Sequence, residues 1–465
     1  MDEEMSLKVS IRFYLCAALV IGTLLFSCTR EPKPNLIVIT IDTLRADHLS
    51  CYGYSKVTSP RIDELAAKAI FFEKAFCQAP QTLPSHAAIF TGMHPRHSGS
   101  ITHESPLEDT RTTLAELLKA QGYTTAAFIS SHALDSKFNL TQGFDTYWEI
   151  HKEYSIRQRA RAHEGGVDFT TDAVLTWLED HKDDRFFVWV HWFHPHRPYN
   201  PPTAYRDRFA GSYEGDATSE PEFIMNVWRN KIDLPQADID YLRGCYDGEI
   251  AFTDYQVGRL LDKLSSLGLM GKTIVVLTSD HGEILYEHEY YFGHDIGLYE
   301  ECLWVPLLLY GPGLLSEHRK VDEPVETIDI MPTLLDLLEI PKPDEIEGRS
   351  LLPLIAGAQF KPTDYFFSET FPFPEKCPPR HAVRTLRTKL IWKENRSGEI
   401  TKEFYDLSQD PGETNNLYEP LNPVAARLDS ALTSWMAPEG LHPGRIPSAR
   451  ETGRWRILKS LGYIN

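Results

Sequence analysis

The sequence predicts an α/β fold with a mostly parallel central sheet and a small C-terminal α+β subdomain that contains an antiparallel sheet. Continuous apolar and β-branched runs recur between residues 35 and 310, and segments with helical spacing of apolar residues separate them. After about residue 340 this alternation gives way to Pro/Gly-rich breaks and short apolar runs. Strands that alternate with helices are typical of parallel sheets, which bind ligands at the carboxyl ends of their strands.

Five runs are expected to form the core strands. A strand that is buried on both faces carries apolar side chains at nearly every position rather than at alternate positions. The runs lie at residues 35–41 (NLIVITI), 124–129 (TTAAFI), 186–192 (FFVWVHW), 273–277 (TIVVL) and 305–310 (VPLLLY).

Helices are expected between these strands, where apolar residues follow one another at intervals of three and four. The expected helices lie at residues 61–72, 112–121, 170–182 and 249–267. Between residues 365 and 407 the short apolar runs favour a small antiparallel sheet. We place the boundary at the Gly/Pro-rich residues 357–363, which gives a main domain at residues 35–357 and a C-terminal subdomain at residues 363–465.

The composition excludes several classes of protein. Hydrophobic residues make up 42% of the chain, which is too many for a disordered protein. The 47 Lys and Arg residues against 66 Asp and Glu residues give a formal net charge of −19, whereas a protein that coats nucleic acid needs clustered positive charge. We therefore expect no nucleic-acid partner.

The N-terminus indicates export. Residues 13–26 (FYLCAALVIGTLLF) have the length of a signal-peptide core and are too short for a comfortable membrane span. The following Ser27-Cys28 resembles a bacterial lipoprotein cleavage box. Residues 1–27 are thus expected to be a signal peptide, Cys28 a lipid anchor and residues 28–34 a tether. The protein would then lie in the bacterial cell envelope, on the periplasmic or outer surface; the alternative is plain secretion.

Carboxylates and a histidine follow two of the expected strands. Asp42 ends the run at residues 35–41, and Asp280 and His281 follow the run at residues 273–277. Two carboxylates and an imidazole at one edge of a sheet could hold a divalent cation. Each aspartate could instead cap the turn that follows it. Taken together, the three residues favour a metal site.

The segment QTLPSHAAIFTG predicts a helix with a reactive N-terminus. Pro84 suits the first turn of a helix, and Gly92 suits its end. Thr82 would then lie just before the helix, where backbone N–H groups attract tetrahedral oxyanions. A hydroxyl there, beside a metal, could be the nucleophile in phosphoryl or sulfuryl transfer. The plainer alternative is that Thr82 only caps the helix.

Several motifs in one order resemble those of the sulfatase family, within the alkaline-phosphatase superfamily. They are NLIVITIDTLRADHLSCYGY, QTLPSHAAIFTG, SDHGE, GHDIGLYEECLWVPLLLYGPG and FYDLSQDPGETNNL, and they extend from about residue 35 to residue 418. The resemblance implies an α/β/α sandwich with an antiparallel C-terminal sheet. It also implies a sulfatase-like catalytic domain at residues 35–357.

The resemblance assigns roles to individual residues. Asp42, Asp280 and His281 match metal ligands, and Thr82 falls at the nucleophile position of the family's C/S-x-P-x-R signature, where it could also ligate the metal. His86 falls where the signature has Arg. His196 matches a histidine that binds the anionic ester oxygens in the family. His294 falls near the position of a lysine that contacts the same group in many family members.

The chain also departs from the family pattern. The family converts Cys or Ser to formylglycine, and Thr82 cannot give this aldehyde because its Cβ already bears a methyl group. Thr43 stands where the family has a second aspartate. His86 and His294 replace residues of permanent charge, so the metal would contribute more to anion binding, or a histidine would protonate the leaving group.

These observations predict a metal-dependent hydrolase that acts on small sulfate esters. The cofactor would be one divalent ion. The oxygen ligands favour Ca²⁺, Mg²⁺ or Mn²⁺, and the imidazole makes Zn²⁺ possible. Two alternatives stay open. Thr82 could serve a phosphodiesterase, a phosphonate monoester hydrolase or a phosphotransferase, or the fold could belong to an inactive binding protein.

Overall fold

The computed structural model describes residues 33–288, 291–361, 363–371, 378–395 and 397–437. The chain divides after Pro34, and the account below concerns the unit that begins at Asn35. The expected signal peptide and the lipid anchor at Cys28 lie outside the described residues, so both stay predictions. Over the described ranges, no helix combines the length and the apolar composition that a membrane span requires.

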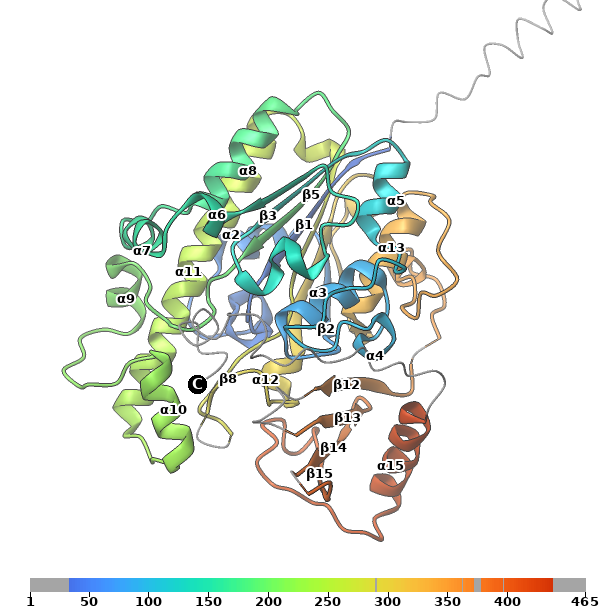
Figure 1. The fold of residues 1–465 in the computed structure, drawn as a ribbon. Coiled ribbons are helices and arrows are strands. Elements are labelled where there is room, and N and C mark those ends of the chain that lie inside the picture. The colour runs from blue at the N-terminus through green and yellow to red at the C-terminus, as the bar shows by residue number, and fades with distance from the viewer. Residues whose placement is uncertain (1–32, 289–290, 362, 372–377, 396, 438–465) are drawn as a thin grey trace, which may run out of the picture. The chain divides into compact units, whose positions relative to one another are not determined.

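A nine-stranded sheet forms the centre of this unit (Figure 1). Its hydrogen-bonded order is β10-β2-β9-β6-β1-β5-β3-β4, with β11 also paired to β2. β9 runs antiparallel to both β2 and β6, and the other pairs are parallel. The strands are β1 (Asn35–Ile41), β2 (Ile70–Phe76), β3 (Thr124–Ile129), β4 (Thr146–Glu149), β5 (Phe186–Trp192), β6 (Thr273–Ser279), β9 (Trp304–Tyr310), β10 (Arg319–Val321) and β11 (Val325–Glu326).

The five predicted strands are confirmed as β1, β3, β5, β6 and β9. Burial on both faces explains why their sequences are continuously apolar. In β1, Leu36 and Val38 belong to the core on one face of the sheet, whereas Ile37 and Ile39 belong to the core on the other.

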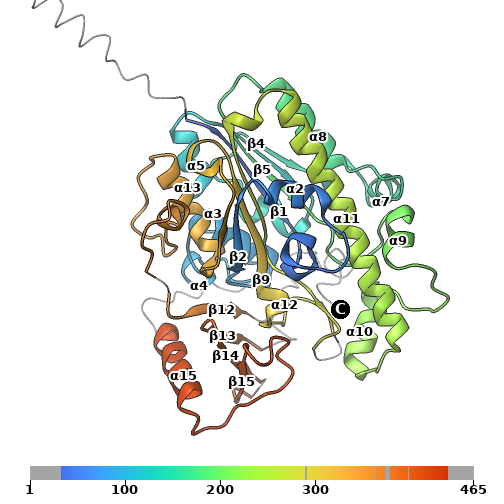
Figure 2. The ribbon, with the colours of Figure 1, turned by 180° about the vertical axis from the view of Figure 1, so that it is seen from behind.

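Helices cover both faces of the sheet, as Figures 1 and 2 show. One face packs against α3 (Thr82–Thr91), α5 (Leu114–Ala120) and α13 (Ile330–Leu337), and the other against α2 (Pro60–Ala66), α8 (Phe169–Asp180) and α11 (Gln236–Ser266). This is the expected α/β/α sandwich.

Shorter elements connect these layers. The helices are α4 (Pro95–Ser98), α6 (Ile150–Glu153), α7 (Ile156–Glu164), α9 (Thr203–Phe209), α10 (Pro221–Asn230), α12 (Glu300–Leu303) and α14 (Leu352–Ile355). Single 3-10 turns lie at Ala46–His48, Ser50–Tyr52, His132–Leu134, Ser136–Phe138, Met270–Lys272, Gly313–Leu315 and Thr327–Asp329. A separate two-stranded ribbon pairs β7 (Ile284–Leu285) with β8 (Phe292–Gly293).

Two predicted helices are corrected. The helix predicted at residues 61–72 ends at Ala66, and Ile70 begins β2, which pairs with β9. The apolar run at this point fits a strand as well as a helix, and pairing with β9 decides between them. The helix predicted at residues 249–267 begins earlier, at Gln236; the prediction missed its first turns because they are rich in charged and polar residues and lack a clear apolar spacing.

The C-terminal subdomain has the predicted antiparallel sheet. Its strands are β12 (Phe366–Thr370), β13 (Arg380–Arg384), β14 (Thr388–Glu394) and β15 (Ile400–Asp406), with α15 (Pro423–Met436) packed against them. The predicted boundary at residues 357–363 lies between α14 and β12.

A buried lysine joins this sheet to the main domain. Lys389 of β14 is fully buried, and its ammonium group lies 2.6 Å from Glu300 at the start of α12 and 2.9 Å from Glu413. Glu300 also pairs with Arg384 of β13 at 2.7 Å.

Candidate active site

The carboxyl ends of two neighbouring strands bring the predicted metal ligands together. β5, β1 and β6 lie side by side in the sheet, and Asp42 follows β1 while Asp280 and His281 follow β6. His281 Nε2 lies 3.4 Å from Asp280 Oδ2 and 4.0 Å from Asp42 Oδ1. All three side chains are fully buried. The predicted grouping of these residues is therefore present.

The charges in this group fit a cation. Asp280 Oδ2 and both carboxylate oxygens of Asp42 are buried and accept no hydrogen bond from any residue that the structure describes. Burial, and then the charge of Asp280, raise the pKa of Asp42 well above its usual range. Such a pair of carboxylates is costly unless a positive charge lies between them.

The tautomer of His281 points to the same conclusion. Its Nδ1 lies 3.0 Å from the Gly282 carbonyl oxygen, to which it donates a hydrogen bond, so the lone pair of Nε2 faces the carboxylates. Burial lowers the pKa of His281 to about 3, which keeps the imidazole neutral. A neutral nitrogen beside two carboxylates is a suitable donor set for a divalent ion.

Thr82 is the first residue of α3, and Gln81 rather than Thr82 occupies the cap position. The helix thus starts one residue earlier than expected, and the capping alternative for Thr82 is wrong. The side chain is fully buried, and its Oγ1 lies 3.5 Å from His281 Nε2. α3 ends at Thr91, and Gly92 caps it in the left-handed conformation, as its predicted place at the helix end implies. The hydroxyl therefore lies against the group of metal-ligand candidates.

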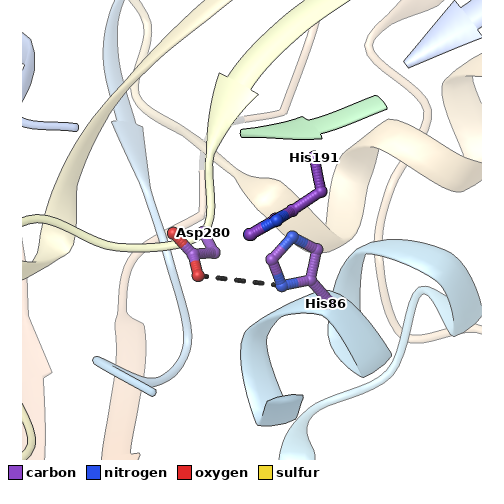
Figure 3. A group of neighbouring side chains, drawn as sticks. All are labelled: His86, His191 and Asp280. Atoms are coloured by element: carbon purple, nitrogen blue, oxygen red, sulfur yellow. Dashed lines mark ion pairs between the residues drawn. The ribbon is translucent and has the colours of Figure 1, made fainter. Parts of the chain in front are cut away.

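His86 lies within the site, but both its ring nitrogens have partners in the protein. It comes from α3 and faces Asp280 at 3.7 Å, with His191 of β5 beside it (Figure 3). Its Nδ1 donates to the Thr82 carbonyl oxygen at 2.7 Å, and its Nε2 lies 3.0 Å from the Thr40 hydroxyl. His86 thus fixes the first turn of α3, and its predicted catalytic role stays a prediction.

His196 and His294 form a pair. Their Nε2 atoms lie 3.2 Å apart, and Nδ1 of each ring faces a backbone carbonyl oxygen, that of Arg197 for His196 and that of Pro80 for His294. Because each Nδ1 donates to its carbonyl, two lone pairs would face each other unless one proton lies between the Nε2 atoms. The His294 ring also lies 4.1 Å from the His281 ring. Burial lowers the pKa of His196 well below its usual range and that of His294 to about 3, so both rings are neutral near pH 7 and their Nε2 lone pairs face each other beside the carboxylates.

Sequence reasoning missed two residues of this site, His191 and Glu283, and did not show the backbone of a third, Thr43. His191 Nε2 lies 3.5 Å from Asp42 Oδ2, but within FFVWVHW it looks like any other core position. Glu283 is fully buried, and burial raises its pKa to about 8. Thr43 has a φ of 57°, which is strained for a β-branched residue, and its N–H donates to Asp280 Oδ1 at 3.2 Å. The SDHGE motif contained Glu283, but the sequence did not assign it a role.

Two family models match the chain, and they overlap between residues 287 and 340. The sulfatase model matches residues 34–340, and the model of the N-sulphoglucosamine sulphohydrolase C-terminal region matches residues 287–437. An arylsulfatase of Clostridium perfringens is 28% identical over 83% of this chain and 90% of its own length. An ulvan-active sulfatase of Formosa agariphila is 29% identical over 92% of this chain and 89% of its own length.

Solved structures show the same fold. A phosphonate monoester hydrolase of Agrobacterium radiobacter aligns with a TM-score of 0.72 at 22% identity and covers 87% of this chain and 95% of its own. A structure in complex with its substrate D-glucosamine-2-N,6-O-disulfate aligns with a TM-score of 0.71 at 21% identity, over 87% of this chain and 97% of its own. With a family model that matches most of its length, this chain belongs to the sulfatase family and is a hydrolase of ester bonds.

Proposed function

We propose that this chain is a divalent-cation-dependent hydrolase of small sulfate esters and that the Thr82 hydroxyl attacks the sulfur. One observation carries the proposal: Thr82 Oγ1 lies 3.5 Å from the metal-facing nitrogen of His281, where the Asp42 and Asp280 carboxylates converge. The curated relatives named sulfatases support the sulfate ester as substrate.

Asp42, Asp280 and His281 would hold the cation, with Thr82 Oγ1 and His191 Nε2 as further donors. Ca²⁺, Mg²⁺ and Mn²⁺ suit the oxygen ligands, and Zn²⁺ suits the imidazoles. When bound, such an ion supplies positive charge that favours the alkoxide of Thr82 and the anionic ester.

In the proposed reaction, the ester is first transferred to Thr82 and is then hydrolysed. Thr82 Oγ forms a bond to sulfur and loses its proton to water, while the bond from sulfur to the alcohol oxygen breaks. The proton that Thr82 releases to water passes to that alcohol oxygen. Water then attacks the sulfur of the Thr82 ester, which releases sulfate and restores the hydroxyl. His86 holds the backbone of Thr82 in place throughout.

Thr82 also favours a second candidate function, the hydrolysis of phosphate or phosphonate esters. A formylglycine hydrate expels sulfate with its second hydroxyl, and threonine has none. A threonine sulfate ester would therefore break down slowly, whereas a phosphothreonine can be attacked at phosphorus. We expect phosphate esters to be turned over at least as well as matched sulfate esters.

Turnover of aryl sulfate and aryl phosphate esters with the same leaving group tests both candidates. We expect Thr82→Ala to lower kcat by at least about 10³-fold, as loss of a nucleophile does. Thr91→Ala is the matched control, because Thr91 lies on the same helix and only donates to the Ala87 carbonyl oxygen.

Efficient sulfatase activity in Thr82→Ala would refute the nucleophile role and favour attack by water. If the wild-type protein binds the cation and turns over neither ester, the chain is a binding protein on this fold. Asp280→Ala should abolish cation binding, and unchanged metal content in that variant would overturn the assignment of the site.

A further inference from the structure

One exposed helix carries three arginines in an otherwise acidic chain. α7 has the sequence IRQRARAHE, which contains Arg157, Arg159 and Arg161, whereas the whole chain has a net charge of −19. None of the three side chains is buried, and none forms an ion pair with a carboxylate in the part of the chain that the structure describes. Arg157 and Arg161 are neighbours at an i,i+4 spacing, where like charges repel. The helix therefore holds positive charge that the protein itself does not neutralise.

Arg159 lacks a partner although it is partly enclosed. Its Nε atom is buried and forms no hydrogen bond with any described residue. Burial lowers the pKa of this guanidinium, and no carboxylate offsets the effect. Burial acts in the same direction on Arg45, but Asp47 and Glu287, which lie 2.7 and 2.8 Å from its guanidinium, raise the pKa of Arg45 instead. An enclosed guanidinium without such partners fits an anion that comes from outside the chain.

α7 borders the loop that carries His196. The helix lies at the edge of the molecule, next to α9 and α11, in both views (Figures 1 and 2). His163 of α7 lies 3.1 Å from Glu249 of α11, and its ring stacks on that of His194 with centroids 3.9 Å apart. His194 is two residues before His196, and the charge of Arg159 reaches it: burial and Arg159 lower the pKa of His194, and Glu249 raises it by more. The arginines of α7 thus lie beside the candidate active site.

We propose that Arg159, with Arg157 and Arg161 beside it, binds a second sulfate group of the substrate, and that the substrate is a polyanion with several sulfate groups. Such a site rests on the proposed function, in which one sulfate ester enters the catalytic site. Guanidinium groups bind tetrahedral oxyanions through two parallel hydrogen bonds, and three of them on one helix suit a ligand with repeated anionic groups. Their field would also attract such a ligand to a protein whose net charge repels it.

A membrane surface is a less suitable partner for this helix. Helices that bind anionic lipids bury an apolar face at the boundary of the acyl chains. Among the nine residues of α7, Ile156 is the only large apolar one, and it lies at the first position. Vesicles of anionic lipid therefore form a separate arm of the test.

Binding of a fluorescein-labelled sulfated dextran, measured by fluorescence anisotropy in EDTA, tests the proposal without any turnover. Wild type should bind the sulfated polymer but not unsulfated dextran, and about 0.5 M NaCl should weaken the binding because salt screens exposed charges. Arg159→Gln should weaken it about tenfold, as the loss of one charge-assisted contact does. Arg427→Gln is the matched control, because Arg427 is an exposed arginine on α15, and it should bind as wild type does.

Activity separates this site from the catalytic one. Arg159→Gln should keep the wild-type kcat/KM for an aryl ester with a single sulfate, which does not reach α7. Its urea unfolding should match that of wild type, because α7 buries no side chain. Polymer binding that depends on Arg159 in a protein that turns over no ester would support the anion site and contradict the proposed function alone.

Two results would overturn the proposal. One is a wild-type protein that does not bind sulfated dextran, or an Arg159→Gln variant that binds it as tightly as wild type. The other is an Arg159→Gln variant that loses affinity for vesicles of anionic lipid and not for the sulfated polymer, which would make α7 a membrane contact.

Discussion

Replacing Asp42 with asparagine should stabilise the metal-free protein and at the same time abolish cation binding. Asp42 is fully buried, and its carboxylate receives no hydrogen bond from the described part of the chain. A buried charged group without a partner costs at least about 1–3 kcal/mol. Asparagine keeps the shape and removes the charge. We therefore expect the free energy of unfolding of Asp42→Asn in EDTA to exceed that of wild type by about this amount.

The pH dependence of this difference has a definite sign. Burial, followed by the charges of Asp280 and Glu283, raises the pKa of Asp42 in the folded state. Above its unfolded pKa of about 3.9, the folded state therefore holds a proton that the unfolded state has released, and wild type loses stability as the pH rises. The stability of Asp42→Asn does not fall in this way. Its free energy of unfolding should therefore exceed that of wild type only slightly near pH 4 and by more at pH 8.

Urea unfolding in EDTA, followed by tryptophan fluorescence, measures both effects, and added Mn²⁺ should then stabilise wild type alone. Asp247→Asn is the matched control. Asp247 is equally buried, but its carboxylate accepts from His48, Tyr54 and Lys56, so its loss should destabilise the protein. If Asp42→Asn is less stable than wild type in EDTA at pH 8, or if Mn²⁺ stabilises it equally, the reasoning about the cation site is refuted.

Three further outcomes are expected. Lys389→Met should lower the free energy of unfolding by about 3–5 kcal/mol in urea, because the buried Glu413 carboxylate loses its cation and Glu300 keeps only Arg384, whereas Lys320→Met, at an exposed ion pair, should change the stability little. Gly282→Ala should lower metal content and activity, because its Cβ would lie 2.0 Å from the Glu301 carbonyl oxygen; full metal content would contradict this. Cys28→Ser should move the protein from the membrane fraction to the soluble fraction, and continued membrane association would refute the lipid anchor.

The core strands were predictable because a strand that is buried on both faces has apolar residues at nearly every position. The antiparallel direction of β9 was not predictable, because a continuous apolar run is equally compatible with a parallel and an antiparallel strand. Ile70–Phe76 was assigned partly to a helix for a related reason: its local pattern fits both periods, and only the partner strand decides.

The candidate site was predictable where a polar residue interrupts an apolar run at its end, as Asp42 and Asp280 do. His191 lies inside such a run, so nothing local separates it from a packing residue. The roles of His86 and His196 depend on which carbonyl oxygen each Nδ1 meets, and those partners come from the folded backbone. Residue identity gave the donors, and tertiary structure gave their orientation.

The position of β1 has a consequence for how the chain acquires activity. β1 is the first strand to be made, yet it pairs with β5 and β6, and the Thr43 N–H reaches Asp280 across 237 residues of sequence. Contacts of such separation form late and slowly. A chain that emerges from its N-terminus therefore cannot assemble its reactive centre until more than half of its length is available. The enzyme would remain inactive during synthesis, and the unpaired apolar β1 would be exposed to aggregation until its partner strands are made.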